Sequence, residues 1–163
     1  MKNRTRLLTL MAVFIAIGTI GSQLLWFPAG VARAYPVQHA INVIAAIILG
    51  PGPAVIIALM ISLLRNLLGL GTIVAFPGAM IGAFVAGVLY KKTQRYSMAA
   101  FGEIIGTGII GSFFAVPIAN LLMGSSVGAL AFIPPFIVSS VSGALIGWLL
   151  VSRLPARQFS LTK

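Results

Sequence analysis

The chain alternates between long apolar stretches and short breaks that are polar or rich in glycine and proline. Six stretches are candidate membrane helices, at residues 7–27, 36–50, 53–68, 76–90, 99–123 and 131–151. The first is about as long as the roughly 20 residues that a helix needs to cross a bilayer. The second and third are shorter, and the Gly50-Pro51-Gly52-Pro53 break between them predicts a tight turn. These two stretches are either two crossings or one re-entrant hairpin, so the pattern predicts six spans or four spans with a hairpin.

The composition assigns these stretches to a membrane. Of the 163 residues, 60% are hydrophobic and only 7% are charged, and the mean hydropathy is +1.11. A soluble domain needs a charged shell, which this chain cannot supply. We therefore expect an all-α integral membrane protein, with residues 1–163 forming a single bundle of about six transmembrane helices.

The basic residues predict how the bundle is oriented. The net charge is +10, and most of the basic residues fall into three clusters: Lys2, Arg4 and Arg6; Lys91, Lys92 and Arg95; and Arg153, Arg157 and Lys163. Short cytoplasmic loops accumulate lysine and arginine, and an even number of spans places all three clusters on that side. We therefore expect both termini to be cytoplasmic, in a multi-pass protein surrounded by lipid in a prokaryotic cytoplasmic membrane. On this interpretation the positive charge reflects topology and not nucleic-acid binding.

The start of the chain also imitates a secretory signal peptide. Basic residues precede an apolar run, and Ala32-Arg33-Ala34 follows it in the manner of a cleavage site. The apolar run is longer than a signal peptide usually has, and removing it would leave an odd number of spans. We therefore expect it to be a membrane span.

Few residues are available for catalysis or for binding a metal. The chain has no cysteine, His39 is its one histidine, and Glu103 is its one acidic residue. This excludes a disulfide scaffold, a side-chain metal cage and a Ser/His/Asp triad, and we expect no enzymatic activity, no cofactor and no metal. Glu103 lies about one turn into the fifth stretch, near the cytoplasmic side, where we expect a structural ion pair with Lys91, Lys92 or Arg95 in preference to a catalytic or proton-relay role. An intramembrane enzyme is then disfavoured, because Glu103 and His39 would lie on opposite sides.

The polar and aromatic residues near the span ends gather in the outer half of the predicted bundle. They form a candidate substrate site that consists of Trp26, His39, Asn42, Arg65, Asn66, Thr72, Phe76 and Asn120. Polar groups within a membrane are costly unless they are paired or used, which favours a binding site. Simpler explanations stay open, since residues of these types also occur at membrane interfaces without a ligand. A small membrane interaction protein without a substrate would share the topology but would not need this set.

Arg65 is the most informative member of the set. Its guanidinium stays charged, and the one carboxylate of the chain is predicted on the opposite side. Its partner is then a backbone carbonyl, water, a lipid headgroup or the substrate. Snorkelling of the side chain to the outer headgroups is the alternative to ligand binding. Asn66 beside it can donate and accept hydrogen bonds, as a hydroxyl-bearing ligand requires.

Small residues recur at a spacing of four, which allows helices to approach closely. They are Ala12 and Ala16 in the first stretch, Gly78, Gly82 and Ala86 in the fourth, and Ser139, Gly143 and Gly147 in the sixth. We expect most of them to serve packing within the bundle. The pair in the first stretch could face another subunit, because a bundle without an ATP site needs a separate motor in order to pump.

The central part of the chain resembles the ThiW family. The resemblance is carried by His39-Ala-Ile-Asn42, Leu49-Gly50-Pro51, Leu64-Arg65-Asn66-Leu-Leu-Gly69-Leu-Gly71-Thr72 and Ala75-Phe76-Pro77-Gly78 with Gly82-Ala83. It extends over nearly the whole chain, although the outer stretches match only in size and hydropathy. It implies a six-helix S component, the substrate-binding subunit of an energy-coupling-factor (ECF) transporter, which binds hydroxyethylthiazole, the thiazole precursor of thiamine, from outside.

The resemblance also implies partners, namely a transmembrane coupling protein and two ATPase subunits. In related S components an Ala-x-x-x-Ala stripe on the first helix contacts the coupling protein, and Ala12 and Ala16 match that pattern. The substrate would enter an outward-facing pocket over which the loop at about residues 28–36 closes.

Hydroxyethylthiazole suits the candidate site, because it is a neutral aromatic ring with one hydroxyl and one ring nitrogen. Stacking is expected from Trp26 or Phe76, and hydrogen bonds from Asn42, Asn66, Arg65 or His39. The predicted absence of a carboxylate from the outer half disfavours cationic thiamine itself. Arg65 leaves an anionic variant open, such as a phosphorylated thiazole or a small carboxylate, and another heterocyclic precursor is a further alternative.

Overall fold

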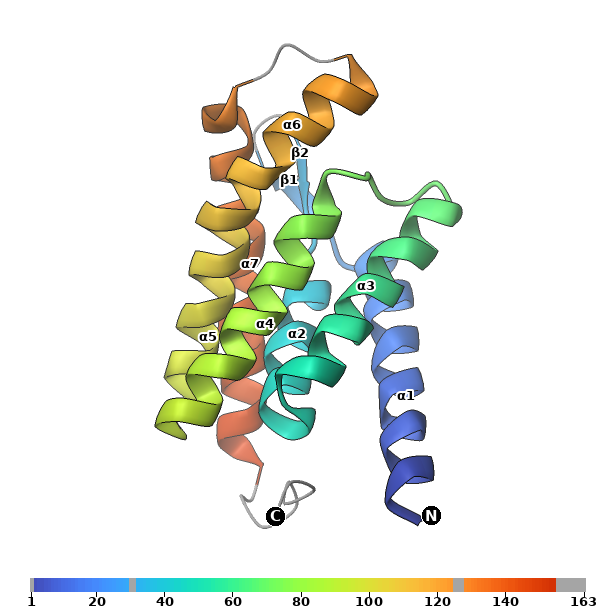
Figure 1. Cartoon of the computed structure of the whole chain (residues 1–163), viewed down its shortest axis with the longest axis vertical. Coiled ribbons are helices and arrows are strands. Elements are labelled where there is room, and N and C mark those ends of the chain that lie inside the picture. The colour runs from blue at the N-terminus through green and yellow to red at the C-terminus, as the bar shows by residue number, and fades with distance from the viewer. Residues whose placement is uncertain (1, 30–31, 125–127, 155–163) are drawn as a thin grey trace.

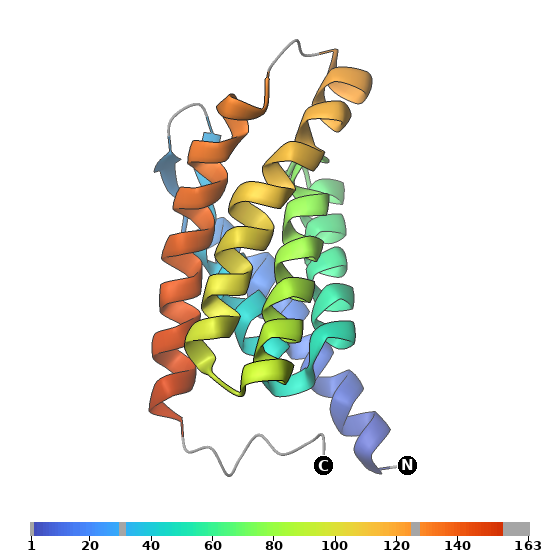
Figure 2. The same cartoon turned by 60° about the vertical axis from the view of Figure 1, so that its left-hand side comes forward.

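Helices lie where the apolar stretches lie. The structure is a computed structural model that describes residues 2–29, 32–124 and 128–154 (Figure 1). Its separate helices are α1 (Lys2–Leu24), α2 (Pro36–Leu49), α3 (Pro51–Leu67), α4 (Ala75–Thr93) and α7 (Ala129–Arg153). Between α4 and α7, the segments α5 (Tyr96–Glu103), η1 (Ile104–Gly111) and α6 (Ser112–Met123) follow one another as a single rod (Figure 2). The segment η1 is a π-helix, a wider form that is often found at functional sites.

Glycine and proline determine the sharpest turn of the bundle. Gly50 ends α2 with a φ of +85°, a conformation that glycine adopts without steric cost. Pro51 begins α3 at the next residue, where its missing N–H is not needed. The chain therefore reverses its direction within one residue, and α2 and α3 run in opposite directions (Figure 1).

The second helix is the centre of the bundle. Twelve of its 14 residues are buried, and it contacts α1, α3, α4 and α7. Gly143 and Gly147 of α7 lie directly against it, so that a Cβ at position 147 would be 2.9 Å from the backbone oxygen of Ala40. The expectation that most of the small-residue stripes serve packing within the bundle is confirmed for these two glycines. In contrast, α1 lies at one edge of the bundle (Figure 1).

Three helices of the described residues are long and apolar enough to cross a membrane. They comprise Arg4–Leu24, Tyr96–Leu122 and Ala131–Arg153, whereas Pro36–Leu49 and Pro51–Leu67 are shorter apolar helices. Six crossings and cytoplasmic termini therefore stay predictions. The beginning of α1 and the end of α7 lie at the same end of the bundle (Figure 1).

A short β-hairpin departs from the all-helical prediction. The strands β1 (Phe27–Ala29) and β2 (Ala32–Ala34) pair antiparallel, with Phe27 opposite Ala34. The hairpin lies toward the end of the bundle away from the beginning of α1 (Figure 1). After β2, the backbone N–H of Tyr35 donates a hydrogen bond of 2.8 Å to Oγ of Ser139, which connects the hairpin to α7.

Candidate functional site

The bundle contains a partly open cavity of about 550 Å³, within the size range of small-molecule sites. Its wall is formed by the end of α1, the hairpin, α2, α3, the connection to α4, α4, η1, α6 and α7. Most of the lining is apolar, and none of the described lining residues is acidic. Its polar and aromatic lining includes the side chains of Arg33, Tyr35, Gln38, His39, Arg65, Thr72, Thr107, Phe132, Phe136 and Ser139.

Arg65 lies in the protein interior at the wall of this cavity. Only 4% of the residue is exposed, so the hypothesis that it snorkels to lipid headgroups is wrong. Its guanidinium donates from Nη1 to Oε1 of Gln38 and from Nη2 to the backbone oxygen of Leu70 at 3.1 Å. Its Cζ lies 3.8 Å from the ring centroid of Tyr35, a favourable cation–π distance. No carboxylate among the described residues pairs with this buried charge.

Gln38 holds the arginine in place from the first turn of α2. Its Oε1 accepts from Arg65, while its Nε2 donates to Oγ of Ser62 at 3.1 Å. Gln38 is 2% exposed and Ser62 is 4% exposed, so both bonds are shielded from water. The guanidinium thus has a fixed orientation, which a binding group needs before its ligand arrives.

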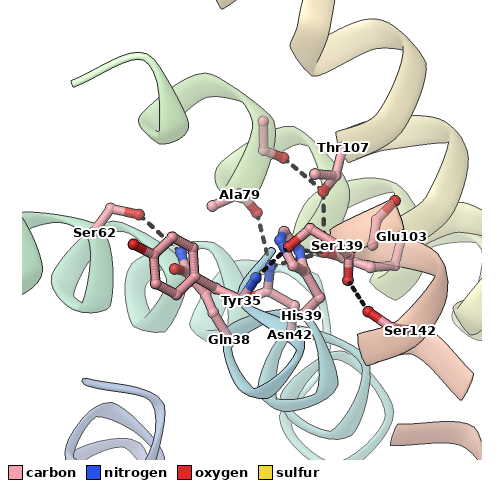
Figure 3. Close-up of polar contacts among 12 residues, drawn as sticks. Tyr35, Gln38, His39, Asn42, Ser62, Ala79, Glu103, Thr107, Ser139 and Ser142 are labelled. Atoms are coloured by element: carbon pink, nitrogen blue, oxygen red, sulfur yellow. Dashed lines mark hydrogen bonds and ion pairs between the residues drawn. The ribbon is translucent and has the colours of Figure 1, made fainter. Parts of the chain in front are cut away.

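Glu103 lies against His39, and its predicted ion pair with the basic loop at residues 91–95 is wrong. His39 Nδ1 is 2.7 Å from Oε1 of Glu103, and the glutamate is completely buried (Figure 3). The prediction failed because it placed Glu103 by its distance from the basic loop. In the folded chain, Glu103 is at the end of α5, nearly two turns into the rod, where it meets the first turn of α2. The only histidine and the only acid of the chain are therefore partners, and not groups on opposite sides.

Neutral donors approach one oxygen of this carboxylate, Oε1, whereas Oε2 is buried without a partner among the described residues. Nδ2 of Asn42 donates to Oε1 of Glu103 at 3.0 Å and to the backbone oxygen of Ala79 at 3.2 Å. Oγ1 of Thr107 lies 3.0 Å from the same Oε1 and 3.0 Å from the backbone oxygen of Gly78 (Figure 3). An ionised carboxylate can only accept hydrogen bonds, so with Glu103 as a carboxylate it is Nδ1 of His39 that donates to Oε1.

Two glycines make room for this polar cluster. A Cβ at position 82 would lie 2.7 Å from Oε2 of Glu103 and would also overlap Oγ1 of Thr107. A Cβ at position 143 would lie 2.5 Å from Cβ of His39. The glycines of α4 and α7 therefore allow the glutamate and the histidine to approach each other from two sides.

The predicted site residues separate into three groups in the structure. His39, Arg65 and Thr72 line the cavity, and Asn42 lies behind the lining against Glu103. The other four do not line it; they are Trp26, Asn66, Phe76 and Asn120. Trp26 is 41% exposed, and its ring lies 4.1 Å from Cζ of Arg33.

Several lining residues were missed, although the sequence contained a signal for some of them. Tyr35, Gln38 and His39 lie in or next to the first turn of α2, and with Asn42 they follow the three- and four-residue spacing of one helix face. Glu103 and Thr107 stand four apart, which also places them on one face. No comparable signal indicated Ser139, which is buried and reaches the cavity through the packing of α7.

A partly polar cavity within a bundle of apolar helices is typical of a membrane protein that binds a small molecule. The ThiW family, described as thiamine-precursor transporter protein, matches residues 8–157 of the 163. The chain belongs to this family, which confirms the resemblance seen in the sequence. It is therefore a membrane transport protein, and the family is one of transporters and not of enzymes. Comparisons with curated proteins and with solved structures gave no match.

Proposed function

We propose that the chain is an S component, the substrate-binding subunit of an ECF transporter, and that its substrate is hydroxyethylthiazole. The observation that carries this proposal is the cavity itself. It combines an apolar lining with a few fixed polar groups, notably Arg65 and His39, and it has no acidic lining residue among those described. Such a cavity suits a small, uncharged heterocycle with one or two hydrogen-bonding groups.

The cavity offers a partner for each part of this substrate. Phe132 and Phe136 line it with their rings 6.1 Å apart and provide an apolar surface for the thiazole ring. They take the role that Trp26 and Phe76 were expected to play. Arg65 is a donor for the ring nitrogen, and His39 or Ser139 can bond to the hydroxyl.

An anionic form of the precursor is a second candidate. Both Arg33 and Arg65 line the cavity, and the described lining has no acidic side chain to balance them. A buried charge without a partner is costly, so a phosphate or carboxylate on the substrate would gain from contact with Arg65. The phosphorylated thiazole and a small carboxylate are therefore the alternatives within the same transport function.

The outer face of α1 fits the proposed partners. Ala12 and Ala16 are exposed, and Leu8 beside them is 65% exposed. Small residues on an unoccupied helix face allow a second helix to approach closely, as the coupling protein would. We propose that the coupling protein docks here and that two ATPase subunits supply the energy. The six helices would cross the cytoplasmic membrane with both termini inside the cell.

Uptake of labelled hydroxyethylthiazole tests this function. Cells that lack their own thiazole uptake would express the chain together with a coupling protein and two ATPases of an ECF module. Accumulation should require both the chain and active ATPases. Accumulation that persists when both ATPases are inactivated would contradict ECF coupling. The same module, paired with an S component for another vitamin, serves as the positive control. If that pair transports its substrate but the chain does not accumulate hydroxyethylthiazole, the thiazole assignment is contradicted.

A further inference from the structure

The single histidine of the chain, His39, lines the cavity and contacts Glu103, which does not line it. Nδ1 of His39 points to Glu103, and the two nitrogens of an imidazole ring point in diverging directions. Nε2 forms no hydrogen bond with another described residue, and it is not among the fully buried polar atoms that lack a partner. Because His39 lines the cavity, Nε2 is the ring atom that is available to a ligand.

The hydrogen-bond pattern indicates which ring nitrogen of His39 donates to the glutamate. Oε1 of Glu103 accepts from Asn42 as well as from His39, and the hydroxyl of Thr107 lies within 3.0 Å of it. These donors reach Oε1 alone, because Oε2 of the glutamate is buried and has no hydrogen-bond partner among the described residues. With the hydrogen on Nδ1, a neutral imidazole has its lone pair on Nε2, which makes Nε2 an acceptor.

Two polar side chains near His39, those of Gln38 and Ser139, already accept hydrogen bonds. Oε1 of Gln38 accepts from Arg65, and its amide donates to Ser62. Oγ of Ser139 accepts from the backbone of Tyr35, which leaves its hydroxyl hydrogen free to donate. The cavity therefore presents donors from Arg65 and Ser139 and a strong acceptor from His39.

We propose that Glu103 is a positioning residue of the substrate site. By accepting the Nδ1 hydrogen of His39, it keeps Nε2 as a hydrogen-bond acceptor in the cavity, and this acceptor selects a substrate that carries a hydroxyl group. The inference rests on the proposed function, because it concerns the same cavity and takes hydroxyethylthiazole as the substrate. The inference adds that Nε2 of His39 binds the substrate hydroxyl and that Glu103 orients His39 for this contact.

Nitrogen NMR of ¹⁵N-histidine-labelled protein tests the positioning role without a ligand. His39 is the only histidine of the sequence, so both ring signals belong to it. The wild-type protein should show a protonated Nδ1 and an unprotonated Nε2. Glu103→Leu removes the acceptor and should give a mixture of both tautomers, whereas Glu103→Gln keeps an acceptor oxygen and should retain the Nδ1-protonated form at least partly. A wild-type ring protonated on Nε2, or a tautomer unchanged in Glu103→Leu, would overturn the proposal.

A pair of ligands tests the selection of the hydroxyl. Hydroxyethylthiazole should shift the Nε2 signal and should bind about 5- to 150-fold more tightly than the ethyl analogue that lacks the hydroxyl, because the analogue leaves Nε2 unpaired. In Glu103→Leu, or in Glu103→Gln if the first variant does not fold, this ratio should be smaller. Equal affinity of the two ligands for the wild-type protein would overturn the inference while the proposed function stands. If neither ligand binds, the thiazole assignment fails, and the tautomer measurement still decides the role of Glu103.

Discussion

A single methyl group added at Gly82 should disturb the substrate site without touching the substrate. In Gly82→Ala the new Cβ would lie 2.7 Å from Oε2 of Glu103 and would overlap the Thr107 hydroxyl, so both side chains must move. Overpacking of this kind costs about 1–3 kcal/mol. Alanine is also favoured over glycine within a helix by about 1 kcal/mol, which partly offsets that cost. The net change in stability is therefore expected between about zero and 2 kcal/mol of destabilisation.

Gly52→Ala is the matched control for this substitution. Gly52 is also helical, and a Cβ at this position meets no atom of another element within 4 Å, but it precedes Pro53, which offsets the gain in helix propensity. Gly52→Ala therefore shows how the protein responds to a glycine-to-alanine change that meets no other helix. Under the proposed role of His39 and Glu103, displacement of the glutamate should also misplace the histidine and weaken the affinity of Gly82→Ala for the substrate, by about 5-fold or more.

Thermal unfolding and calorimetry of the purified variants measure both effects. The apparent Tm of Gly82→Ala should be below that of Gly52→Ala, and its Kd for hydroxyethylthiazole should be higher. The same Tm and the same Kd in both variants would show that position 82 does not pack against the side chains of Glu103 and Thr107.

Two other substitutions test the remaining parts of the site and the docking face. Arg65→Ala should weaken binding by about 1–3 kcal/mol, measured by calorimetry, since a charged donor to the ligand is lost, and an unchanged Kd would show that Arg65 only holds Tyr35 and its neighbours. Ala12→Trp should abolish uptake in cells while the Kd of the isolated protein stays unchanged, because the bulky ring blocks the coupling protein. Val138→Trp, at an exposed position on α7, is its control and should transport normally; equal loss of uptake in both variants would contradict docking on α1.

The helices were largely predictable from the sequence. Apolar runs of 15 to 25 residues bounded by glycine and proline leave few alternatives, and each of the six coincides with a helix or with the rod from Tyr96 to Met123. The hairpin was not predictable, because two strands of three residues each have no recognisable periodicity. The number of membrane crossings also stays a prediction, since length alone leaves α2 and α3 below the usual span.

The site was predicted less well, for a physical reason. Sorting residues by predicted side of the membrane treats depth as the only coordinate, and it separated Glu103 from His39. A side chain in a bundle also has an angular position around its helix, which decides whether it faces the cavity or lipid. His39 and Arg65 face inward and line the cavity, whereas Asn120 is exposed although its depth seemed suitable.

Ligand binding by the purified chain tests the central claim most directly. Calorimetry would compare hydroxyethylthiazole, its phosphate, thiamine and the aminopyrimidine precursor of thiamine on folded protein without any ECF partner. We predict tight and selective binding of hydroxyethylthiazole. Preference for the phosphate would make Arg65 an anion anchor and replace the neutral substrate by the anionic one. A folded sample that binds none of the four would contradict the assignment of this cavity to a thiamine precursor.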